Sequence, residues 1–426
     1  MSAVPVDRNV QVDRSMVDSL LQVNRMLYKM PPSISIANSR HYQTGFPQQQ
    51  AYGPGRTIVF DSQTGSAFID GMTSYLKFRI TTNNTGDFGR GSAAQLVERA
   101  VVRSRQGKEL CRLEGANLIG HMYDRFTCPQ GWFTTAGPAE GYPVGAGGDA
   151  TAENTGAGDG DWTGGVVFIL PIHKLCPFLK QGKLLPPQIM EGLRIELTLN
   201  SVADALYWDG VTGSAVTDYT LDQIEMKWDA YDIADQFKRS VMEMSASQGL
   251  NLVHKEWYRT IVSATADQFD FDIKKAASKA LQVVTIPRLT AALNLVTADS
   301  SIAETYDFSR QQYHVGSVYY PNTPLDTTQT LAGNKESFWW VLAAFRSLPC
   351  KEFQDVSPTT YTSRFGVSSA SLNKSQTSDI QGTIINNSRS LLAELQFASS
   401  ASRRLDSYLC HLRAVKVYPS NCVVRD

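Results

Sequence analysis

The sequence predicts an all-β protein made of two consecutive antiparallel sandwiches, and three observations support this fold class. Between Leu193 and Trp228, two stretches alternate apolar with polar residues, a period of two that places one face of each strand in a core. Short strand-like segments before and after this region form two series, each with one helical segment and one long loop. Strands and helices do not alternate regularly, which argues against a parallel, doubly wound sheet.

The composition narrows the class of protein further. The chain has 426 residues, of which 42% are hydrophobic, 10% aromatic and 19% charged, so we expect two to three globular domains. A formal net charge of −1 does not suggest the basic surface that nucleic-acid binding requires. The six cysteines lack C-x-x-C spacing and are predicted to be free thiols. We expect a soluble protein made without a signal peptide, since no apolar leader or uncharged run of 18 residues occurs.

Residues 1–55 are predicted to form an N-terminal arm that carries a short amphipathic helix. Two prolines, at positions 31 and 32, end this helix. Its apolar stripe must pack on this molecule, on a neighbour or on a membrane, and packing on protein is favoured because the polar face is not rich in lysine. The stripe, which we predict to make assembly contacts, consists of Met16, Leu20, Val23, Leu27 and Met30.

The first sandwich is predicted over residues 56–232. A helix is expected at 115–126, and a long loop at 137–165, where ten of 29 residues are glycine, is expected to be functional or mobile. Residues 106–108 are expected to turn one strand into the next. The predicted strands cover residues 57–60, 75–81, 96–104, 109–113, 166–170, 193–199 and 219–228.

The second sandwich is predicted over residues 233–426, beginning with a helix and connector at 233–250. A second helix is expected at 338–348, and a Ser/Thr-rich loop at 356–383. Each series has about eight strands, which is the number in a jelly roll. The predicted strands of this series cover residues 252–262, 269–273, 280–286, 313–320, 391–397 and 407–418.

A search for chemical motifs predicts no catalytic, cofactor-binding or metal site, and therefore no enzyme. The acidic segment 159–161 lacks the later ligands of a calcium loop. The six histidines are dispersed without H-E-x-x-H spacing, and neither a phosphate-binding loop nor a G-x-S-x-G elbow occurs. Trp132, Trp162 and Trp208 are near loops and could bind sugar rings, although core or interface packing is the more common use of tryptophan.

Four segments, in their order and spacing, resemble a known family. Residues 71–78 are similar to an early strand of the first jelly roll in double jelly-roll major capsid proteins of tailless icosahedral double-stranded DNA viruses. Residues 101–110, followed by 117–118, resemble the next strands and helix. Residues 184–197 are similar to the approach to the late strands, and residues 312–324 to an element of the second jelly roll. The resemblance covers about residues 56–424.

The resemblance implies a structural protein of the virion with no cofactor. Copies would assemble as homotrimers with a pseudo-hexameric outline, and these would tile an icosahedral shell. The loops at 137–165 and 356–383 would form towers or clasps between subunits. The N-terminal arm would lie beneath the shell, against minor capsid or penton proteins or an internal membrane.

Three other functions are compatible with the same sequence. The chain could be a vertex or minor capsid protein, a carbohydrate-binding sandwich that uses its loop tryptophans, or a glycoside hydrolase built on a β-sandwich. The symmetry of the assembly, a glycan array and an assay on generic glycans separate these alternatives from a major capsid protein.

Overall fold

The structure, a computed structural model, describes most of the chain outside the arm. The predicted apolar stripe of residues 16–30 and the acidic segment 159–161 lie outside the described residues. Among the described helices, none combines the length and the apolarity that crossing a membrane requires. The described residues are 37–143, 162–208, 210, 213–326, 334–345, 356–374, 382–418 and 421–425.

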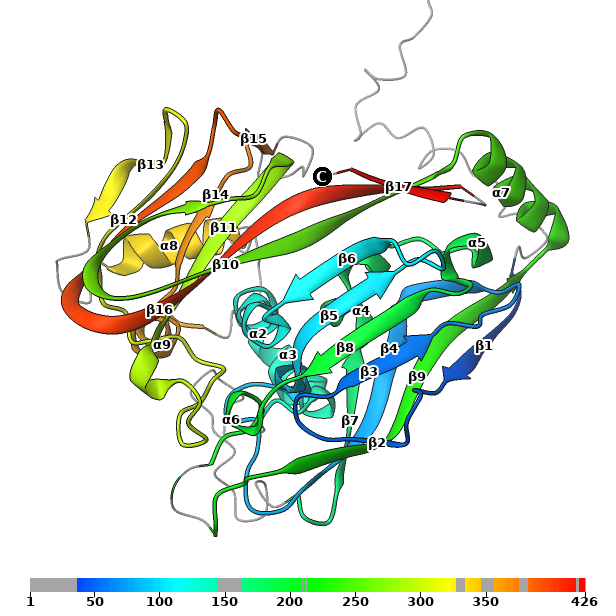
Figure 1. Cartoon of the computed structure of the whole chain (residues 1–426), viewed down its shortest axis with the longest axis horizontal. Coiled ribbons are helices and arrows are strands. Elements are labelled where there is room, and N and C mark those ends of the chain that lie inside the picture. The colour runs from blue at the N-terminus through cyan, green and yellow to red at the C-terminus, as the bar shows by residue number, and fades with distance from the viewer. Residues whose placement is uncertain are drawn as a thin grey trace, which may run out of the picture.

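The first half of the chain forms two antiparallel sheets that face each other across an apolar core (Figure 1). One sheet has the order β1-β9-β4-β7, with β2 added beside β9, and the other has the order β3-β8-β5-β6. Alternating apolar residues of these strands point into the space between the sheets, as the period of two predicts. The strands are β1 (Ala37–Gly45), β2 (Ala51–Tyr52), β3 (Thr57–Asp61), β4 (Phe68–Thr82), β5 (Val97–Arg103), β6 (Glu109–Glu114), β7 (Val166–Pro171), β8 (Arg194–Leu199) and β9 (Tyr219–Ile233).

The second half forms one hydrogen-bonded sheet that curls over a second apolar cluster. Its two longest strands, β10 and β16, pair along nearly their whole length and bend together (Figure 1). The strands are β10 (Leu250–Ile273), β11 (Ala277–Leu289), β12 (Phe308–Val315), β13 (Val318–Asp326), β14 (Ser368–Ser371), β15 (Thr383–Ile385), β16 (Leu391–Tyr418) and β17 (Asn421–Arg425).

Short helices connect the strands, and α7 joins the two halves. Helix α2 follows β6 in the first half, and α8 follows β13 in the second. The α-helices are α2 (Ala116–Thr127), α3 (Gln130–Thr135), α4 (Ile172–Leu175), α5 (Pro187–Met190), α6 (Val202–Ala205), α7 (Asp235–Ser247), α8 (Asn334–Ala344) and α9 (Pro358–Arg364). The 3-10 helices are η2 (Ala93–Leu96), η3 (Gly137–Glu140), η4 (Pro177–Leu179) and η5 (Thr290–Ala292).

The two halves repeat one strand order. Strand segments are numbered in chain order within each half, with β2, β15 and β17 omitted. In the second half, β10 and β16 each count as two segments because each passes from one wall of the curled sheet to the other. Both halves then have one layer with the order 1-8-3-6 and a facing layer with the order 2-7-4-5.

The sequence predicted four strands where the structure has two long ones. The predicted strands 252–262 and 269–273 are both parts of β10, and the register shifts between Ala266 and Gln268, where the strand bends. Likewise, the predicted strands 391–397 and 407–418 are both parts of β16. The polar residues between the predicted strands are therefore not turns, because they stay in the ladder while the sheet curls.

Other local predictions also differ from the structure. The predicted single strand 313–320 is a hairpin, with Gly316 in the left-handed region at a φ of 62°. The predicted loop 356–383 contains α9, β14 and the start of β15. The predicted helix 338–348 begins earlier, because α8 covers Asn334–Ala344. Residues 37–52, predicted to belong to the arm, include β1 and β2, and both strands pair with β9.

Candidate functional site: the junction and two uncovered surfaces

The two halves meet at an extended junction, which covers one surface of each. On the first half it comprises β6 and α2, called here the β6–α2 side. On the second half it comprises the outer face of the 1-8-3-6 layer, called here the second outer face, where β10 lies against β6. The large apolar cluster continues across this boundary, so the halves share a core. Buried residues that the second outer face contributes to the cluster are Leu252, Val284, Ile286, Tyr408, Val415 and Val417.

Glu256 is the main polar anchor of the junction. Its carboxylate, on β10 of the second half, accepts a hydrogen bond from the backbone N–H of Arg112 on the edge strand β6, at 2.8 Å. The same oxygen, Oε1, accepts another from Nη1 of Arg413 at 2.6 Å. Glu256 is only 5% exposed, so these donors replace the water that the carboxylate loses on burial.

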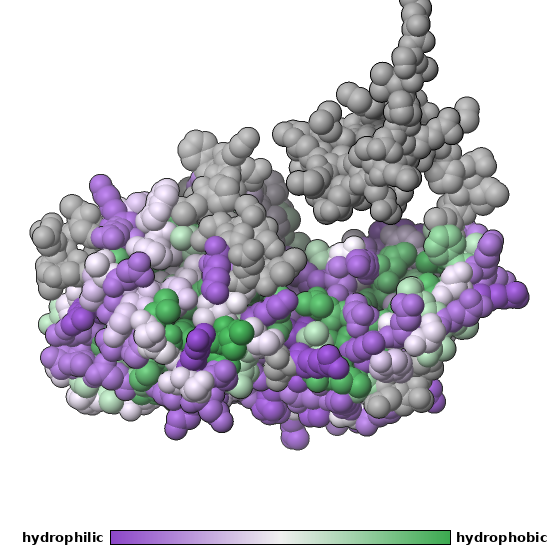
Figure 2. Space-filling model, turned by 90° about the horizontal axis from the view of Figure 1, so that it is seen from above, coloured by the Kyte–Doolittle hydropathy of each residue, from purple (hydrophilic) through white to green (hydrophobic). Residues whose placement is uncertain are grey.

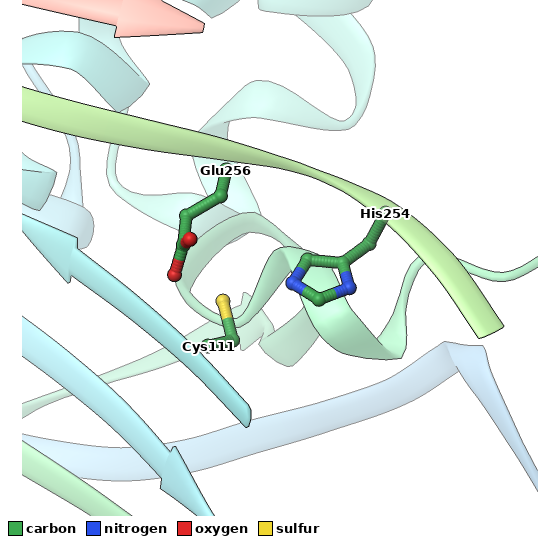
Figure 3. A group of neighbouring side chains, drawn as sticks. All are labelled: Cys111, His254 and Glu256. Atoms are coloured by element: carbon green, nitrogen blue, oxygen red, sulfur yellow. The ribbon is translucent and has the colours of Figure 1, made fainter. Parts of the chain in front are cut away.

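Three side chains near this anchor have donor types that bind transition metals. The ligand atoms of Cys111, His254 and Glu256 lie within 4.8 Å of one another, where β6 faces β10 (Figure 3). Burial raises the pKa of Cys111 well above its usual value, so the thiol is protonated in the metal-free chain. Arg413 already neutralises Glu256, and a divalent ion beside it would be repelled. We therefore interpret the group as part of the junction and not as a metal centre.

A second polar contact closes the junction at the start of α2. The hydroxyl of Tyr408 donates to the carbonyl oxygen of Gly115 at 3.3 Å. Gly115 has a φ of 60°, and a Cβ there would clash with Oη of Tyr408 and lie 2.9 Å from Cζ of Arg259. Arg259 is held in turn by Asp406, which it contacts at 2.6 Å. Burial alone would raise the pKa of Asp406, but the charges of Arg288 and Arg259 outweigh this effect and hold it below its usual value.

Aromatic rings and a crevice complete the junction. Phe126 of α2 stacks on Phe345, which follows α8, with ring centroids 5.2 Å apart. A crevice of about 450 Å³, lined by residues of both halves, also lies at the junction. At the crevice the backbone N–H of Arg90 donates to Asp299 at 3.0 Å, and the two side chains form an ion pair at 3.7 Å. Burial raises the pKa of Asp299 to about 6, although hydrogen bonds from Ser301 and the charge of Arg125 oppose the rise.

The 1-8-3-6 layer of the first half also has an outer face, and this first outer face is exposed. It carries a ladder of ion pairs across β1, β9 and β4, between side chains that are exposed or half-buried except for Asp229, which is buried. Apolar side chains flank the ladder: Tyr42 of β1 packs edge-on against Tyr75, and Val167 and Ile169 project from β7. The pairs are Arg40–Asp229 at 2.7 Å, Arg79–Asp222 at 2.6 Å, Lys227–Glu225 at 2.9 Å and Lys77–Glu225 at 3.9 Å.

In the part of the chain that the structure describes, the segments of the second half that correspond to β6 and α2 are β13 and α8, and both carry exposed apolar side chains. Here β13 is the edge strand and α8 follows it, so we call this surface the β13–α8 side. Val318 and Tyr319 on β13 are 50% and 43% exposed, and Trp339 on α8 is 59% exposed. The face of the molecule in Figure 2 is mostly hydrophilic, with separate apolar patches among the polar side chains. Exposed apolar residues at a sheet edge are typical of a surface that contacts another molecule.

The structure places the three tryptophans considered for sugar binding in different surroundings. Trp162 is buried and packs against Phe88 and Phe168, so it cannot stack on a sugar ring. Trp132 packs against Phe133 and Tyr142. Trp208 is half-buried, and its backbone N–H donates to the second half at Val296. The exposed tryptophan is Trp339, which sequence reasoning did not single out.

Comparison with known proteins identifies the fold. No family model and no curated protein sequence matches the chain. Among solved structures, the PBCV-1 virus capsid model is similar with a TM-score of 0.59, 11% identity, and 94% of this chain and 99% of that chain covered. The Faustovirus major capsid protein is similar with a TM-score of 0.60, 10% identity, and 94% of each chain covered. For the Sputnik virophage structure the TM-score is 0.59, with 10% identity, and 100% of this chain and 93% of that chain covered.

The chain has a double jelly-roll fold. Both the full-length similarity and the repeated 1-8-3-6 and 2-7-4-5 layers lead to this assignment. The predicted fold class, all-β with two consecutive antiparallel jelly rolls, is confirmed. In this double jelly roll, the junction fixes one jelly roll against the other through a shared core, and leaves the first outer face and the β13–α8 side uncovered among the described residues.

Proposed function

We propose that this protein is a structural major capsid protein, with no catalytic role, that acts by self-assembly into the shell of a virion. The similarity of almost the whole chain to viral capsid structures is the observation that carries the proposal. The shared core at the junction supports it, because a building block for a lattice must hold its two jelly rolls in a fixed orientation.

The assembling unit is a homotrimer whose six jelly rolls give a pseudo-hexameric outline, and these trimers form an icosahedral shell. Native mass spectrometry of the purified protein tests the unit. The expected result is a species of three times the chain mass of 47.0 kDa. A stable monomer at micromolar concentration would contradict the proposal, and electron microscopy that shows hexagonal capsomers would support it.

The N-terminal arm contributes assembly contacts in this proposal. Its apolar stripe, Met16, Leu20, Val23, Leu27 and Met30, packs on neighbouring capsid protein, on minor capsid or penton proteins, or on an internal membrane. Deletion of residues 1–30 is expected to leave folded trimers but to reduce shell assembly. A variant that fails to fold would place the stripe in the core instead. We further propose that the first jelly roll begins at residue 37, since β1 pairs within its first sheet.

Two alternatives remain testable. A vertex or minor capsid protein would share this fold, and its copy number in the assembled shell distinguishes it from a major capsid protein. Carbohydrate binding would have to use an exposed ring such as Trp339, because Trp162 is buried. A glycan array with the natural protein and with Trp339→Ala tests this second alternative.

A further inference from the structure

Helix α7, which joins the two jelly rolls, presents an apolar stripe at its surface. Phe237 and Met244 are 49% and 46% exposed, and the half-buried Val241 lies between them on the same face of the helix. These positions recur at steps of four and three residues, which is the spacing of the seam between two packed helices. The stripe is therefore typical of a helix that packs along a second helix.

The N-terminal arm joins the first jelly roll beside this helix. Strand β1 begins at Ala37, which pairs with Ile233 at the end of β9. Only Ala234 separates Ile233 from the start of α7 at Asp235. In Figure 1, β1 and α7 lie at the same end of the molecule. The point from which the arm extends is therefore next to the N-terminal end of α7.

The lengths of the arm's segments fit a return onto α7. The connection between the predicted helix and β1, residues 31–36, spans at most about 20 Å when fully extended. A helix over residues 16–30 would be about 22 Å long, and α7, with 13 residues, is about 20 Å long. Since the predicted helix ends close to the start of α7, the short connection favours an antiparallel arrangement of the two helices.

In this antiparallel arrangement the two apolar stripes have the same spacing. The stripe of the arm also advances by steps of four and three residues, so three of its side chains can face the three on α7 at once. The facing pairs are Met30–Phe237, Leu27–Val241 and Val23–Met244. Leu20 and Met16 would extend past the end of α7, where they remain available for the assembly contacts proposed for the arm.

We infer that, before assembly, the predicted helix of the arm docks on α7 of its own chain as a short antiparallel pair. The connection through residues 31–36 keeps the stripe of the arm near α7, so its effective concentration there exceeds that of any second copy in dilute solution. Docking removes apolar side chains of both helices from water, which keeps the unassembled protein soluble. This inference goes beyond the proposed function, because it names the surface that receives the arm and does not require that a shell forms.

A pair of introduced cysteines tests the contact in the purified, full-length protein. After mild oxidation, the variant with Leu27→Cys and Val241→Cys should form a disulfide within one chain, which peptide mapping by mass spectrometry identifies. The matched control combines Leu27→Cys with Met242→Cys: Met242 is 52% exposed but lies on another face of α7, so we expect several-fold less disulfide. Equal yields for the two variants, or a disulfide between chains that gives a dimer on a denaturing gel, would overturn the inference.

Hydrogen exchange measures the docking without cysteines. Phe237→Asp should raise the exchange rate of the amides of residues 20–30 about tenfold or more, because a carboxylate in the seam releases the arm. Met242→Asp should leave these rates unchanged, and unchanged exchange in β16 shows that each variant stays folded. Rates that are already fast in the natural protein would overturn the inference. Docking in a protein that never forms trimers would uphold it and refute the proposed function, whereas trimers with an undocked arm would give the opposite outcome.

Discussion

The outer faces of the two jelly rolls occupy the same place in the fold but have different chemistry. The second outer face is covered by the β6–α2 side, and its buried Glu256 is hydrogen-bonded to Arg112 and Arg413 inside the molecule. On the first outer face, pairs such as Arg79–Asp222 and Lys77–Glu225 lie at the surface. A surface that is covered as the chain folds can be apolar, whereas an exposed surface keeps charged groups that interact with water.

The comparison is tested most strongly by removing one carboxylate from each face. Glu256→Ala leaves Arg413, whose side chain is only 14% exposed, without its anion, and we expect a loss of roughly 3–5 kcal/mol in the free energy of unfolding. Asp222→Ala removes the partner of Arg79 on the first outer face, where water can solvate the guanidinium, so we expect a much smaller loss. Urea denaturation of both variants measures the difference, and equal losses would refute the distinction between the faces.

A methyl group at the junction should have the next largest effect. Gly115→Ala introduces a Cβ that clashes with Tyr408 and strains a left-handed residue, so we expect a loss of roughly 2–4 kcal/mol. Gly107→Ala is the control: its φ is 77°, but no atom lies within 4 Å of the added Cβ. Its loss should be limited to the backbone strain, on the order of 1 kcal/mol. Similar melting temperatures for the two variants would contradict close packing at Gly115.

Acidic pH provides a third test, at the crevice of the junction. The pKa of Asp299 is raised to about 6 in the folded chain, above about 3.9 for an unfolded aspartate. The folded state therefore binds the proton more tightly, and this residue's contribution to stability is lost as pH rises from about 4 through 6. Asp299→Asn should reduce the change in the free energy of unfolding over this pH range by on the order of 1–3 kcal/mol. Melting temperatures of the natural protein and of the Asp299→Asn variant, measured between pH 4 and 7, test this expectation. If the two melting temperatures change in parallel with pH, the expectation is wrong.

The smallest effect is expected at the edge of the first outer face. Arg40 holds β1 to β9 through two hydrogen bonds to Asp229, at 2.9 and 2.7 Å. Arg40→Ala should increase hydrogen exchange of the β1 amides several-fold while global melting changes little, because edge strands open locally. Lys77→Ala, in the ladder but on an inner strand, is the control and should leave β1 exchange unchanged. Slow exchange at β1 in the Arg40 variant would show that the backbone ladder alone holds the strand.

The fold class could be predicted because alternation of apolar and polar residues indicates a strand with one buried face. Residues 193–199 and 219–228 alternate clearly, and they became β8 and most of β9. Strand β1 was missed for the same reason: its residues are mostly exposed, so its place depends on backbone pairing with β9 and not on an apolar pattern. The join between the predicted strands 252–262 and 269–273 was missed because exposed polar residues in a curled ladder resemble a turn.

The contacts of the junction were beyond reach of sequence reasoning. Glu256 and Arg112 are separated by 144 residues, and their contact depends on how two complete jelly rolls pack. Cysteine spacing also gave no indication that Cys111 would face His254 and Glu256 across that boundary. The repeated strand order could not be predicted from the sequence either, because it depends on which strands pair and not on identical residues in the two halves.

The continuity of β10 and β16 has a mechanical consequence. A long antiparallel pair that is pulled along its axis must break many hydrogen bonds at once in shear, whereas separate short strands can peel apart one after another. The second jelly roll, in which this pair links both walls, should therefore resist force along its strands better than the first, where turns separate β3 from β4 and β8 from β9. Under load, we expect the corners of the first jelly roll to yield before the second deforms.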